Sequence, residues 1–159
     1  MCVIVDTCCL PQVFDGGCKQ HSQFAPVFSW INGSGCMVYG GTKYNAELSR
    51  APKYLNLITQ LRKAGRAIQM PSEQVDPIAA ALKARYPEPR FDDEHIVALV
   101  IASRCVVVCT NDDAAISYLR RNELFAPHGV KRPSIFRGRR NHHRMCCERN
   151  VAGVCRRRP

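Results

Sequence analysis

The stretch Cys105-Val106-Val107-Val108-Cys109 decides the fold, because it is apolar at every position and rich in β-branched side chains. Successive side chains of a β-strand point to opposite faces, so a strand that is apolar throughout must be covered on both faces. Strands of this kind are typical of parallel sheets. We therefore predict a parallel sheet with helices packed on each side of it.

Shorter apolar segments alternate with helical patterns on either side of this strand. We predict further strands at residues 2–5, 37–39, 67–70 and 134–137. Apolar residues recur at helical spacing over 24–31, where Asn32 and Gly33 end the pattern. The other predicted helices begin at Thr42 as a cap, at Pro52, at Asp76 as a cap with Pro77 in the first position, at Asp92 or Asp93 to cover 96–103, and at Ala114 to cover 114–120.

This order of elements predicts an α/β fold, namely a three-layer α/β/α sandwich with a mostly parallel central sheet. The length of 159 residues is typical of one domain. We place that domain at residues 1–136 and treat 137–159 as a basic C-terminal tail, partly disordered, with disorder beyond about residue 146.

Charge is concentrated in this tail. Residues 1–130 hold 13 lysines and arginines against 12 acids, whereas residues 131–159 hold 10 against the single acid Glu148. Basic tails attract nucleic acid through counterion release, although a solvated tail that only aids solubility is an equal alternative on charge alone. For an RNA partner, the candidate contacts are Arg137, Arg139, Arg140 and Arg144.

The ten cysteines do not predict a disulfide scaffold. Most of them lie in apolar runs, where a free thiol packs as a small hydrophobic group. The His142, Cys146 and Cys155 region is a weak candidate for a metal site, because its spacing differs from that of known zinc sites. The apolar runs are too short to span a membrane and the N-terminus has no leader pattern, so we expect a cytoplasmic protein with no membrane partner.

Acidic residues follow the predicted strands. Asp6 ends the first strand, and Asp112 follows the 105–109 strand after a short turn. Asp93 opens the helix before that strand, and Glu47 lies on the helix after residues 37–39. The carboxyl ends of parallel strands share one edge of a sheet, where ligands bind. Carboxylates gathered there favour a hard divalent cation such as Mg²⁺ or Mn²⁺, which suits phosphodiester hydrolysis.

Four segments in this order resemble the PIN-domain family of ribonucleases. They are the strand that ends at Asp6, the helix segment Ala46-Glu47-Leu48, the segment Asp93-Glu94-His95-Ile96-Val97-Ala98-Leu99, and the strand followed by Thr110-Asn111-Asp112. Each segment alone is a weak signal, but four in the family's order are a strong one. The resemblance covers residues 2 to about 120.

The resemblance implies a metal-dependent endoribonuclease, often the toxin of a type II toxin–antitoxin pair. Asp6, Glu47, Asp93 and Asp112 would be the catalytic residues and the ligands of Mg²⁺ or Mn²⁺. Thr7, Thr110 and Asp113 would support them. Asp113 is the alternative to Asp112 as a site residue, and Asp92 is the alternative to Asp93. Each of these two alternatives could instead cap a helix. The expected partners are RNA, an antitoxin protein and a second copy of the chain.

Two other hypotheses come from different functional classes. A catalytically silent module of the same fold would bind RNA or a protein, and the presence of all four acids argues against it. A phospho-acceptor receiver domain is also α/β, but it needs an acidic pair after its first strand, where this chain has Asp6 followed by Thr7 and Cys8. It also needs a lysine after a late strand, where the chain offers only Lys131.

Overall fold

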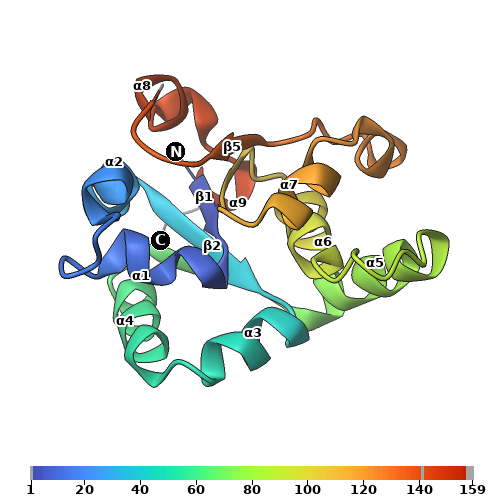
Figure 1. Ribbon diagram of the computed structural model, residues 1–159, viewed down its shortest axis with the longest axis horizontal. Coiled ribbons are helices and arrows are strands. Elements are labelled where there is room, and N and C mark those ends of the chain that lie inside the picture. The colour runs from blue at the N-terminus through green and yellow to red at the C-terminus, as the bar shows by residue number, and fades with distance from the viewer. Residues whose placement is uncertain (1, 141, 157–159) are drawn as a thin grey trace.

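Residues 2–140 and 142–156 are described by the computed structural model, which is built on one five-stranded parallel sheet (Figure 1). The strand order is β3-β2-β1-β4-β5, and every neighbouring pair is parallel. The strands are β1 (Cys2–Val5), β2 (Cys36–Gly40), β3 (Ala67–Met70), β4 (Val107–Cys109) and β5 (Ser134–Phe136). The predicted α/β class and parallel sheet are confirmed.

The helices lie between the strands in the chain and cover the sheet. They are α1 (Leu10–Phe14), α2 (His21–Asn32), α3 (Thr42–Ser49), α4 (Pro52–Lys63), α5 (Ser72–Arg85), α6 (Glu94–Ser103), α7 (Asp113–Leu119), α8 (His142–Met145) and α9 (Gly153–Arg156), with short 3₁₀ turns at η1 (Thr7–Cys9), η2 (Asn122–Leu124), η3 (Ala126–His128) and η4 (Glu148–Asn150). Figure 1 shows α1, α2 and α4 on one side of the strands and α5, α6 and α7 on the other, as right-handed crossovers require, with α3 beyond the end of β2. The arrangement is a three-layer sandwich.

The strand order contains one reversal, which lies between β1 and β4. The chain moves outward from β1 to β2 and β3, then crosses back over the sheet through α5 and α6 to form β4 on the other side of β1. Clefts in open parallel sheets form beyond the carboxyl ends of the strands at such a reversal. Asp6 follows β1 and Thr110 follows β4, so both candidate segments flank this point.

Burial explains why β1 is the central strand. All four of its side chains are 0% exposed, and β4 is fully buried as well. The predicted strand at 105–109 is two residues too long, because regular pairing within β4 begins at Val107. Cys105 still lies in the core, and its thiol donates to the Val107 carbonyl.

The predicted start of the helix at Asp76 is wrong, because α5 begins at Ser72 and contains Pro77. The carboxylate of Asp76 does not cap its own helix. It accepts from the backbone N–H of Thr42 at 2.9 Å and from the Thr42 hydroxyl at 2.5 Å. It therefore satisfies a free N–H at the start of α3, 34 residues away in the chain.

The turn from β2 into α3 depends on two glycines. Thr42 is not the cap of α3 as predicted, because Gly41 occupies the N-cap position with φ 80°. Gly40 has φ 136°, and a Cβ there would lie 2.2 Å from the Met70 carbonyl oxygen. A Cβ on Gly41 would lie 2.8 Å from a side-chain carbon of Val75. Only glycine allows this close approach, which sets the direction of the helix that carries Glu47.

The prediction of disorder beyond residue 146 is wrong for residues 147–156, which form η4 and α9. Ala152 and Cys155 are buried in the core, and Cys155 forms a disulfide with Cys2 of the central strand. The two cysteines are 153 residues apart in the chain. The other eight cysteines are free, so there is one disulfide and no scaffold. Residues 157–159, also predicted to be disordered, lie outside the described residues.

None of the helices within residues 2–140 and 142–156 is long and apolar enough to cross a membrane.

Candidate active site

Strand register brings Asp6 and Thr110 together. Val5 of β1 is paired with Cys109 of β4, so the next residue of each strand emerges at the same edge. The Asp6 N–H continues the ladder by donating to the Cys109 carbonyl at 2.9 Å. The Thr110 hydroxyl donates to Asp6 Oδ2 at 2.7 Å, with Asp6 4% exposed and Thr110 0% exposed. Asp6 is thus a buried carboxylate with a fixed orientation.

Glu47 reaches the same edge from α3. One turn earlier on this helix, the Tyr44 hydroxyl donates to the Val5 carbonyl at 2.5 Å, which anchors α3 to the end of β1. Thr7 then donates its hydroxyl to Glu47 Oε2 at 2.7 Å. Burial raises the pKa of Glu47, but the nearby His95 ring and the hydrogen bond from Thr7 outweigh it and hold that pKa below its usual value. Glu47 is therefore ionised at neutral pH.

Asp93 is the carboxylate whose pKa is raised by its surroundings. It occupies the N-cap position of α6, yet its side chain caps no backbone N–H. Burial raises the pKa of Asp93 to about 6, and the negative charges of Asp6, Asp92 and Asp112 add to the effect. Asp6 and Asp112, two of the other three predicted acids, are therefore close enough to Asp93 to act on its charge. The convergence of all four acids on one edge stays a prediction.

Asp112 follows β4 and caps the next helix. Its Oδ1 accepts from the backbone N–H groups of Ala114 at 2.7 Å and Ala115 at 3.2 Å, while its own N–H donates to the Thr110 hydroxyl at 3.1 Å. The cap role considered for Asp113 therefore belongs to Asp112. Asp113 is exposed and forms an ion pair with Arg137 at 3.1 Å, so it points away from the acid cluster, which we define as Asp6, Glu47, Asp93 and Asp112.

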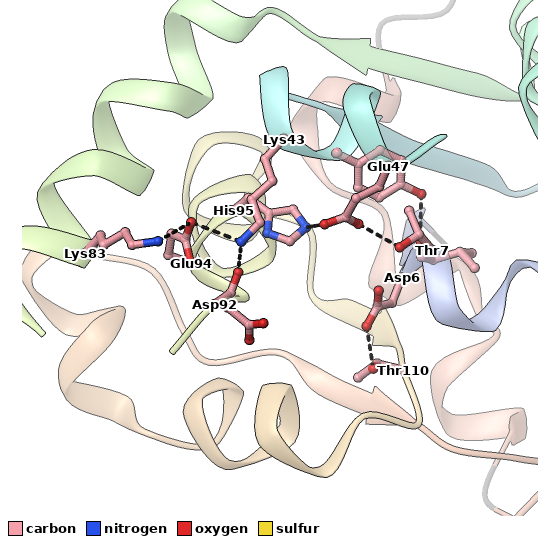
Figure 2. A network of polar contacts seen from close by, with 11 residues as sticks. Asp6, Thr7, Lys43, Glu47, Lys83, Asp92, Glu94, His95 and Thr110 are labelled. Atoms are coloured by element: carbon pink, nitrogen blue, oxygen red, sulfur yellow. Dashed lines mark hydrogen bonds and ion pairs between the residues drawn. The ribbon is translucent and has the colours of Figure 1, made fainter. Parts of the chain in front are cut away.

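A second polar network beside the acid cluster was not predicted (Figure 2). The buried carboxylate of Glu94 lies 3.2 Å from Lys43 Nζ and 3.8 Å from Lys83 Nζ. Lys43 also donates to the Asp92 carbonyl. His95 is buried, with its Nε2 3.6 Å from Glu47 Oε1. One signal was available in the sequence, because Lys43 precedes Glu47 by four residues and so shares its helix face.

The donor chemistry of the acid cluster fits Mg²⁺ or Mn²⁺. Both ions prefer oxygen ligands, and the crowded, partly buried carboxylates carry a charge that a divalent cation would neutralise. Within residues 2–140 and 142–156, however, no three His, Cys, Asp or Glu side chains form a ready-made metal-binding group. Ion binding would therefore require the carboxylates to close in through side-chain rotation. The described residues of the His142 and Cys146 region form no such group either, so the structure gives no support to the metal site considered there.

We expect the pH dependence of stability to identify Asp93. Its folded-state pKa of about 6 lies above the value of about 3.9 for an unfolded aspartate. The folded state then binds the proton more tightly, so stability with EDTA present should fall as pH rises from about 4 to about 6. Asp93→Asn should remove this fall and raise stability above that window, as measured by urea denaturation at a series of pH values.

Glu47→Gln is the matched control for Asp93→Asn, because it also removes one carboxylate charge. The pKa of Glu47 is lowered, so its ionised form stabilises the fold. The Gln variant should therefore lose stability at neutral pH, the opposite sign to Asp93→Asn. An unchanged pH slope in Asp93→Asn would contradict the crowding that we describe.

No family model, curated protein or solved structure matches this chain.

Proposed function

We propose that the chain is a metal-dependent endoribonuclease that hydrolyses RNA phosphodiester bonds at the acid cluster. The observation that carries the proposal is that Asp6, Asp93 and Asp112 lie at the reversal point of a parallel sheet, close enough for Asp6 and Asp112 to raise the pKa of Asp93, while Glu47 is held beside Asp6 by Thr7. Asp93 among them has a pKa raised to about 6 by burial and by its acidic neighbours. A protein bears such repulsion at a functional site more often than elsewhere.

Each acid has a role in this proposal. Asp6 and Asp93 would be the central ligands of Mg²⁺ or Mn²⁺, with Glu47 and the free oxygen of Asp112 completing the set. A bound ion lowers the pKa of its water and neutralises charge that develops on the phosphate. The hydroxyls of Thr7 and Thr110 hold Glu47 and Asp6 in place, at 2.7 Å in each case. The lysines on Glu94 reduce the negative potential that an approaching phosphate would meet.

The finer parts of the proposal are supported by the four sequence segments that resemble PIN-domain ribonucleases. On that basis, the chain would act as the toxin of a type II pair, with an antitoxin protein and a second copy of itself as partners. Products would carry a 5′-phosphate and a 3′-hydroxyl. Arg137, Arg139, Arg140 and Arg144 would contact the RNA backbone, and all four lie on the segment that leaves β5.

The test is cleavage of a mixed RNA pool by the purified chain with Mg²⁺ or Mn²⁺. We expect cutting that stops with EDTA and returns when excess metal is added back. Single-stranded DNA of the same length serves as the control substrate. Cutting that continues in EDTA would contradict the proposal. RNA that binds to the chain but is cut with neither Mg²⁺ nor Mn²⁺ would also contradict it and would favour a binding module.

A further inference from the structure

A concave site lies away from the acid cluster, between α2 and the segment that contains α8. This groove encloses about 470 Å³ and is lined by Ser29 and Trp30 from α2 and by Arg139, His142 and Cys146 from the C-terminal segment. Small-ligand sites in proteins are typically about 300–1,000 Å³. No residue of the acid cluster lines the groove, so its chemistry is independent of the carboxylates.

The lining residues suit a nucleotide. Trp30 supplies an aromatic surface, and bases stack on such surfaces whatever their sequence because every base has a π-face. Arg139 supplies a guanidinium, which is planar, always charged and able to bind phosphate through two hydrogen bonds. The Ser29 hydroxyl and the His142 ring can form hydrogen bonds with base edges or the ribose. The groove thus combines one stacking surface with one phosphate-binding cation.

Trp30 is held in place by its neighbours. A Cβ on Gly35 would lie 2.0 Å from Trp30 Cδ1 and 2.4 Å from Trp30 Nε1, so the indole lies directly against the Gly35 backbone. The Gly35 N–H also donates to the Trp30 carbonyl at 2.7 Å. An aromatic ring fixed before binding loses little conformational freedom when a base stacks on it.

The chain connects this groove to the start of α7, directly after Asp112. Arg137 forms an ion pair with Asp113, the residue after Asp112 of the cluster. Gly138, with φ 144°, then turns the chain towards α2, where a Cβ on Gly138 would lie 3.7 Å from Gln23 Cβ. Arg139 follows and lines the groove. Two residues span at most about 7 Å, so one RNA strand can contact both Arg137 and Arg139.

We propose that the groove between α2 and α8 is a subsite for single-stranded RNA that holds one unpaired nucleotide, with its base against Trp30 and its phosphate on Arg139. The proposal rests on the proposed function in taking RNA as the ligand. It adds a second point of contact beyond the carboxylates. The strand would be held on both sides of the turn at Gly138.

Trp30 is the only tryptophan in the chain, so its fluorescence reports on the groove alone. The experiment titrates random-sequence RNA hexamers into the full chain in EDTA, where no metal-dependent cleavage occurs. We expect saturable quenching of the Trp30 emission. Hexamers should bind Arg139→Ala about tenfold more weakly, the effect of one lost charged hydrogen bond. The absence of quenching at saturating RNA would overturn the proposal.

Arg149→Ala is the matched control, because it removes the same charge from an exposed position of the C-terminal segment outside the groove. We expect less than about a twofold change in affinity for this variant, since one exposed charge that does not line the groove is largely screened. Equal losses in Arg139→Ala and Arg149→Ala would show that only net charge matters and would overturn the subsite.

Trp30→Phe and Trp30→Ala separate stacking from folding, since Phe keeps an aromatic ring against Gly35. With labelled hexamers followed by anisotropy, Phe should retain most of the affinity and Ala should lose about fivefold or more. Equal affinity of all three forms would overturn the base contact. Quenching without cleavage in Mg²⁺ would support the groove and refute the nuclease. Cleavage without quenching would do the reverse.

Discussion

Asp6→Asn is expected to abolish metal-dependent RNA cleavage, with a loss of more than about 100-fold in kcat. Removing a residue that only hydrogen-bonds to a metal ligand lowers metal affinity or activity by about 10–100-fold. Removing a direct ligand should therefore lower activity by more than that. The substitution keeps an oxygen that can accept from Thr110, and the 2.7 Å hydrogen bond can therefore remain. It also removes a charge that raises the pKa of Asp93. The fold should be as stable as the wild type, or more so, in EDTA.

Asp15→Asn is the matched control for this experiment. Asp15 lies after α1 and pairs with Lys53 at 2.7 Å, a surface contact of little energetic weight. We expect wild-type cleavage from this variant under identical conditions. Both variants would be compared by single-turnover cleavage and by urea denaturation. Normal cutting by a correctly folded Asp6→Asn protein would remove the acid cluster as the site of reaction.

Cys155→Ala is expected to lower the free energy of unfolding by about 3–5 kcal/mol. The disulfide with Cys2 joins residues 153 positions apart, and a cross-link over so long a loop strongly restricts the unfolded chain. Net stabilities of domains are only about 5–15 kcal/mol, so the loss would be a large fraction of the total. Alanine is chosen because a serine hydroxyl would be buried in the core at this position.

Cys105→Ala provides the matched control, because Cys105 is equally buried but free. Its loss should cost only the packing of one thiol. Dithiothreitol should destabilise the wild type and Cys105→Ala by the same amount and leave Cys155→Ala unchanged, as measured by urea midpoints. A reducing cellular compartment would break the Cys2–Cys155 bond and destabilise the protein as dithiothreitol does. A wild-type urea midpoint that does not change when dithiothreitol is added would show that the Cys2–Cys155 bond contributes nothing to stability.

Local patterns predicted the elements that depend on local forces. The strand at residues 67–70 and the helix that begins at Pro52 appear as expected, because a short apolar segment ended by Pro71 and a proline in the first turn of a helix act within a few residues. The start of α5 was misplaced because Asp76 serves Thr42 on another helix. The Cys2–Cys155 bond was missed for a related reason, since no spacing rule links cysteines at opposite ends of a chain.

The candidate site shows the same division. Parallel topology is enough to bring Asp6 and Asp112 to one edge, and it could be inferred from apolar strands alone. Asp112 caps α7 and Asp113 pairs with Arg137, a division that depends on a single backbone turn. The preference for Asp112 over Asp113 as a site residue stays a prediction. The burial of Glu94 under two lysines depends on how α3, α5 and α6 pack together. Helix packing of this kind leaves no clear mark in a single sequence.

The central position of β1 has a consequence for synthesis on the ribosome. β1 can pair with β2 as soon as residues 36–40 emerge, but its other edge stays open until residues 107–109 are made. The nascent chain therefore exposes an apolar strand edge for most of its elongation, a period in which chaperones would be needed. Asp112 is translated later still, so any ribonuclease activity can begin only after most of the chain has left the tunnel. A potentially harmful activity would then be delayed by topology alone.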